Sequence, residues 1–74
     1  MPKTIYSKDH KHTIERLKKA RLDAGMGQIK TAKLLGRTQS YVSKVESGQR
    51  RIDIVQLKEF ARIYKKSVDY FIKK

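Results

Sequence analysis

The chain has 74 residues, and its 19 lysines and arginines against 7 aspartates and glutamates give a formal net charge of +12. A chain of this length forms one small domain whose core is too small for a catalytic cleft with its supporting residues, so we expect no enzyme activity. It contains no cysteine, which excludes a disulfide scaffold and a thiolate zinc site. It also lacks a signal-peptide core and an apolar run long enough for a membrane span, so we expect a soluble, cytoplasmic protein.

The positive charge favours a polyanionic partner, and nucleic acid is the first candidate. For any single lysine, the alternative is that it only keeps the protein surface solvated and does not contact nucleic acid. The functional interpretation therefore depends on motifs and not on charge.

Residues 1–10 are expected to be a mobile arm and residues 11–74 a single helical domain. Helical spacing predicts a first helix from about Lys11 to Ala24, and Gly25 is well placed to end it in the left-handed conformation. The expected inward positions are Ile14, Leu17 and Ala20 or Arg21.

Two short helices follow, with Gly36 as a permissive turn between them. The second spans about Gln28 to Leu35, and Thr38 caps a third that continues through Ser47 and ends at Gly48. Each has one apolar face, made by Ala32 and Leu35 in the second and by Val42 and Val45 in the third.

The other face of the third helix carries small and long hydrogen-bonding side chains: Gln39, Ser40, Ser43 and Lys44. Side chains of these types reach base edges and phosphates in a major groove. Residues 28–48 therefore predict a helix-turn-helix that reads double-stranded DNA.

The C-terminal third predicts two more helices after a basic loop. Asp53 and Ser67 are expected N-caps, and one face of the fourth helix is shared by Leu57, Phe60, Ala61 and Tyr64. Two interpretations of the apolar C-terminal residues remain open: an interface for a second copy, or closure of the core by Phe71. The interface would use Tyr64, Val68, Tyr70 and Phe71.

Metal and catalytic chemistry are not indicated. His10 and His12 are two residues apart, which does not fit a helical ligand pair, and no third ligand is evident. Ser40 and Ser43 have no neighbouring histidine in the motif and no oxyanion loop. We expect no metal, cofactor or small-molecule ligand.

Over about residues 12–72 the chain resembles the lambda-repressor-like, Cro/C1-type family of bacterial and phage transcription regulators. The matching positions are Leu17, Arg21, Gly25, Gln28, Ala32, Leu35, Gly36 and the run from Thr38 to Gly48. The resemblance implies an all-α, compact five-helix bundle that binds operator DNA as a two-fold dimer, with the third helix in the major groove.

The resemblance also assigns roles. Gln39 is expected to read a base, since a glutamine amide pairs with adenine, and Ser40 and Lys44 are the other expected base readers. Gln28 is expected to bond a phosphate while bracing the start of the third helix. Further contacts with the phosphates of the DNA backbone are expected from Thr38, Tyr41, Ser43, Arg50 and Arg51. Arg21 and Glu46 are expected to form a structural ion pair.

Three neighbouring positions depart from the family pattern. Gly27 replaces the usual hydroxyl N-cap of the second helix, Lys30 stands where an acidic residue is common, and Thr31 replaces an aliphatic residue. A hydroxyl on a core face needs a partner, for which we expect a carbonyl of its own helix.

Three functional hypotheses follow. The leading one is a dimeric, sequence-specific regulator, such as a phage or mobile-element repressor or a restriction–modification controller. The second is an antitoxin-like module that binds a partner protein as well as DNA. The third is nonspecific cationic binding to RNA, DNA or anionic membrane, which predicts indifference to sequence and loss of binding in salt.

Overall fold

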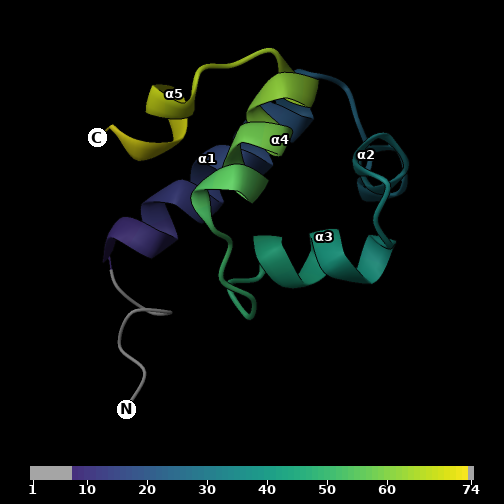
Figure 1. Ribbon diagram of the computed structural model, residues 1–74, viewed down its shortest axis with the longest axis horizontal. Helices are drawn as coiled ribbons and strands as arrows, with labels where there is room; N and C mark the ends of the chain where they lie inside the picture. Colours follow the sequence, from purple (N-terminus) through teal and green to yellow (C-terminus); the bar gives the residue numbers. More distant parts are fainter. Residues whose placement is uncertain (1–7, 74) are drawn as a thin grey trace.

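The computed structural model describes residues 8–73, which form five helices and no strand (Figure 1). The helices are α1 (Lys8–Asp23), α2 (Gln28–Leu35), α3 (Gln39–Glu46), α4 (Ile54–Tyr64) and α5 (Val68–Ile72). The expected all-α bundle is therefore confirmed. No helix in this part of the chain has both the length and the apolar character needed to cross a membrane.

The first helix begins at Lys8, three residues before the expected start at Lys11. Asp9 lies in its first turn, where a carboxylate interacts favourably with the positive end of the helix dipole. Residues 8–10 therefore belong to α1, and the rest of the expected arm, residues 1–7, lies outside the residues that the structure describes.

Local capping residues set the start of the later helices as predicted. The side chains of Thr38, Asp53 and Ser67 accept hydrogen bonds from the backbone of the first turns of α3, α4 and α5. Asp53 forms a full capping box, in which the Gln56 side chain accepts from the Asp53 amide at 2.9 Å. These bonds satisfy amides that have no partner within the helix.

The core forms where all five helices meet, and its fully buried side chains include Leu17, Val42, Val45, Phe60 and Phe71. In Figure 1, α2 and α3 lie at one end of the molecule, and α5 packs against the N-terminal half of α1 at the other. Two bonds hold α5 to α1: the Thr13 hydroxyl donates to the Phe71 carbonyl at 3.0 Å, and His12 Nε2 lies 2.6 Å from the Lys73 carbonyl.

Two residues of the expected dimer surface belong to this core instead. Tyr64 is 4% exposed and Phe71 is fully buried, so neither can contact a second copy without opening the domain. Their assignment to an interface is wrong, and the alternative, closure of the core by Phe71, is confirmed. Val68 and Tyr70 are half-buried.

Thr31 is fully buried, and its partner is not the expected carbonyl of its own helix. Its hydroxyl accepts a hydrogen bond from the Tyr64 hydroxyl at 3.3 Å and lies 3.9 Å from the Met26 sulfur. The expectation was wrong because α4 brings a hydroxyl donor across the core to α2. This bond replaces the apolar contact that an aliphatic residue would make between the two helices.

Candidate nucleic-acid interface

The turn between α2 and α3 sets the angle of the helix-turn-helix. Gly36 has a φ of 70° and a ψ of 32°, a left-handed conformation that costs glycine little. The amides of Gly36 and Arg37 donate to the Lys33 and Ala32 carbonyls at 3.2 and 2.9 Å, which closes the C-terminus of α2. Thr38 then starts α3 by accepting from the Tyr41 amide at 3.1 Å.

Helix α3 presents one apolar and one polar face. Val42 and Val45 are fully buried on the side toward the core. The predicted base readers Gln39, Ser40 and Lys44 are all exposed, as is Ser43. The three predicted base readers are therefore all exposed on one helix, and α3 lies at an edge of the molecule (Figure 1).

The predicted ion pair between Arg21 and Glu46 is present and is largely buried. Arg21 Nε donates to Glu46 Oε2 at 2.7 Å and Nη2 donates to Oε1 at 3.1 Å, while the two side chains are only 10% and 5% exposed. Its remaining terminal nitrogen donates to the Met26 carbonyl at 2.9 Å. The hydrogen bond to Glu46 raises the pKa of Arg21, so the guanidinium stays charged.

A chain of hydrogen bonds connects this pair to the surface of α3. The Gln28 amide nitrogen donates to Glu46 Oε1 at 3.2 Å, and the Gln28 amide oxygen accepts from Gln39 Nε2 at 3.4 Å. Gln28 therefore braces the start of α3, as expected. The first exposed side chain of α3 is oriented by a charge pair buried behind it.

Among the predicted phosphate contacts, Tyr41 is placed differently from the others. Thr38, Ser43, Arg50 and Arg51 are exposed, whereas Tyr41 is 9% exposed and its hydroxyl is shielded from solvent. Burial raises the pKa of Tyr41, although nearby Arg37 and Arg50 oppose part of this effect. A direct hydroxyl contact with a phosphate does not fit this placement.

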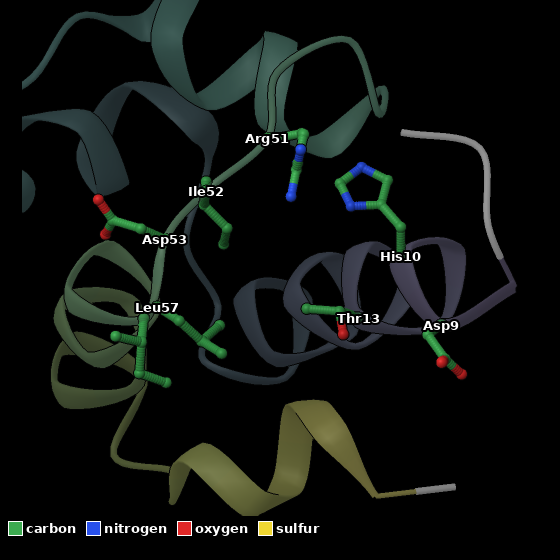
Figure 2. Close-up of a pocket in the computed structure, with 8 residues that line it drawn as sticks. Asp9, His10, Thr13, Arg51, Ile52, Asp53 and Leu57 are labelled. Atoms are coloured by element: carbon green, nitrogen blue, oxygen red, sulfur yellow. The ribbon is translucent and has the colours of Figure 1, made fainter. Parts of the chain in front are cut away.

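The two arginines of the basic loop point to different parts of the molecule. The Arg50 guanidinium lies over the Tyr41 ring, 5.0 Å from its centroid. Arg51 instead faces His10 of α1 across an open groove of about 400 Å³ (Figure 2). The apolar part of the groove lining consists of Ile52, Ile54 and Leu57. Of these two loop arginines, Arg50 is therefore the one directed toward α3.

Arg37 was not among the predicted contacts, yet it lies next to them. It is exposed, its guanidinium carbon is 5.2 Å from the Tyr41 ring centroid, and Nη2 is 3.9 Å from Glu59 Oε1. The available sequence signal was an arginine directly before the Thr38 N-cap, because arginine side chains and helix N-termini both commonly contact phosphates.

Residues 8–73 contain no group of three or more His, Cys, Asp or Glu side chains that could hold a metal ion. The two histidines of α1 have different neighbours. His12 is close to the Lys73 carbonyl, while His10 lines the groove beside Arg51.

The comparisons with known proteins agree with this geometry. A helix-turn-helix family model matches residues 17–71. The restriction–modification controller protein C.AhdI from Aeromonas hydrophila is 30% identical over 85% of this chain and 91% of its own, with a TM-score of 0.78. No curated protein sequence matches the chain. The chain therefore belongs to the Cro/C1-type helix-turn-helix family of sequence-specific, DNA-binding transcription regulators.

Proposed function

We propose that this protein regulates transcription by binding a two-fold symmetric operator as a homodimer, with α3 of each protomer in the major groove. The observation that carries the proposal is the exposed row of Gln39, Ser40 and Lys44 on α3, with Gln39 oriented by Gln28. In this proposal Gln39 and Lys44 read bases, because their amide and ammonium groups match adenine and guanine edges, and Ser40 contributes a weaker contact.

A dimer follows from the size of the reading surface. One eight-residue helix offers few base contacts, and two half-sites about one helical turn apart supply the contacts that selective binding needs. Since Tyr64 and Phe71 are buried, the proposed interface uses Val68, Tyr70 and the exposed Ile72 of α5 together with exposed Ile54 and Val55 of α4. Thr13 donates to the Phe71 carbonyl of α5 and lines the same groove as Ile54 of α4.

The similarity to a restriction–modification controller favours a controller of that kind over a phage or mobile-element repressor. A catalytic role has no support in the arrangement of the described residues. Ser40 and Ser43 are exposed on α3, whereas both histidines lie on α1. We therefore propose binding alone as the activity.

The experiment is selection of bound DNA from a random duplex pool at near-physiological salt, followed by sequencing. An enriched inverted repeat supports a dimeric operator-binding regulator. Binding without enrichment that disappears in salt contradicts it and favours the electrostatic hypothesis. Co-purification with a partner protein and no enriched DNA would favour the antitoxin-like hypothesis.

Sedimentation tests the interface separately. Ile54→Glu and Ile72→Glu should each shift the protein toward monomer, because a charge opposes burial of the apolar surface. Ile29→Glu is the matched control, since Ile29 on α2 is 59% exposed and Ile54 is 56% exposed. Equal oligomeric states for all three variants would contradict the proposed surface.

A further inference from the structure

Two arginines from opposite ends of the α3 segment meet at one aromatic ring. Arg37 comes just before α3 and Arg50 follows it, yet their guanidinium carbons lie 5.2 and 5.0 Å from the same Tyr41 centroid. Because both distances end at one point, the two guanidinium carbons are no more than about 10 Å apart. Both arginines are exposed residues.

The Tyr41 ring is held in place by packing against the core. Tyr41 is 9% exposed and stacks on Phe60, with centroids 6.2 Å apart and planes 14° apart. Its hydroxyl is shielded from solvent and has no hydrogen-bond partner among residues 8–73. The described side-chain contacts of Tyr41 are therefore made by its ring and not by its hydroxyl.

The chemistry of this arrangement suits a phosphate backbone. An arginine on an aromatic face gains cation–π attraction and keeps N–H donors that match phosphate oxygens. Holding the guanidinium groups before binding reduces the side-chain entropy that each contact loses. Arg37 Nη2 also lies 3.9 Å from Glu59 Oε1, so this guanidinium has an ionic neighbour as well as an aromatic one.

We propose that Arg37, Tyr41 and Arg50 form a preorganised clamp for the DNA backbone beside the major groove. Arg37 and Arg50 contact phosphates, and Tyr41 is a positioning residue that acts through them. The clamp rests on the proposed function, since it places α3 on a duplex, but it predicts binding strength and salt dependence and not sequence preference.

The test compares the dependence of the binding constant on salt for wild type and variants, on the selected operator and on a random duplex of equal length. Arg37→Gln should weaken both duplexes several-fold and lower the slope of log K against log salt by about 0.9. Arg62→Gln is the matched control, because Arg62 is an exposed arginine in the last turn of α4, at the end that points away from α3 (Figure 1). It should leave the slope unchanged.

Tyr41 variants test the positioning role. Tyr41→Phe keeps the ring and should keep the wild-type slope, whereas Tyr41→Leu should lower it although both arginines remain. Since Tyr41 is a core residue, circular dichroism and urea unfolding must first show that the leucine variant is folded. If it is unfolded, Arg37→Gln and the double variant with Arg50→Gln decide the proposal.

The outcomes separate the two proposals. Wild type that enriches an operator, together with an Arg37→Gln slope equal to that of Arg62→Gln, overturns the clamp alone. Wild type that binds DNA without enrichment overturns the operator proposal, and the clamp is then judged on the random duplex. Failure of wild type to bind any duplex contradicts both.

Discussion

The side-chain oxygen of Gln28 accepts a hydrogen bond from the side-chain nitrogen of Gln39 at 3.4 Å, while the nitrogen of Gln28 donates to Glu46 at 3.2 Å. Gln28 thus lies between a buried carboxylate and the first exposed side chain of the reading helix. Because Glu46 is held by two bonds from Arg21, the position of Gln39 depends on contacts that begin in the core.

Removing the Gln28 amide should reduce selectivity more than stability. Gln28→Ala loses one part-buried hydrogen bond to Glu46, with an expected cost of about 0.5–1.5 kcal/mol in urea unfolding. The selected operator should be bound more weakly, because Gln39 loses its orienting partner, whereas a random duplex should be affected less. Gln49→Ala, at an exposed loop glutamine, is the control. Operator binding at the wild-type level would show that Gln28 does not brace Gln39.

The Arg21–Glu46 pair should be essential for folding. Arg21→Met or Glu46→Leu leaves the other charge buried, with an expected cost of about 3–5 kcal/mol in urea unfolding. The double variant should cost less than the two single variants together, because no charge is then stranded. Lys19→Met, in an exposed pair with Asp23 at 3.8 Å, should cost about 0.5 kcal/mol or less. Similar losses for both pairs would contradict the structural role.

The hydroxyl pair of Thr31 and Tyr64 predicts a compensating double variant. Thr31→Val removes the acceptor and leaves the Tyr64 hydroxyl unpaired in the core, with an expected cost of about 1–3 kcal/mol. Adding Tyr64→Phe should recover most of this loss, because neither hydroxyl then needs a partner. Thermal unfolding of the two single variants and the double variant measures the coupling. Additive losses would show that the bond across α2 and α4 does not contribute.

Alkaline pH should destabilise the protein through its buried tyrosines. Burial raises the pKa of Tyr41 and of Tyr64 above the ordinary value of 10.0. The unfolded chain therefore loses these protons first, so the stability they contribute is complete below about pH 10 and falls as the pH rises through the folded values. Urea unfolding across this window should show the decline, and Tyr41→Phe should reduce its slope. Tyrosinate absorbance that titrates identically with and without denaturant would contradict this prediction.

The sequence was sufficient for features that depend on neighbouring residues. Thr38, Asp53 and Ser67 were recognised as N-caps because the bond that each makes lies within its own first turn. The left-handed backbone at Gly36 likewise followed from residue type. The Arg21–Glu46 pair, which joins residues 25 positions apart, was expected only through family resemblance.

Features that depend on packing between distant segments were not predictable. The apolar period of α4 and α5 marked Tyr64 and Phe71 as buried or interfacial without separating the two, and only the fold placed them in the core. Thr31 meets Tyr64 because α2 and α4 pack together. Lys65 closes α4 with a φ of 59°, where the sequence offers no glycine as a signal.

The most direct test of base reading by α3 compares Gln39→Ala with wild type on the selected operator, on each of its single base-pair variants and on a random duplex. We expect a loss of about 1–3 kcal/mol on the operator, relaxed preference at one base pair of each half-site, and no change on the random duplex. Equal losses on operator and random DNA, with the base preference intact, would contradict base reading by α3 through Gln39.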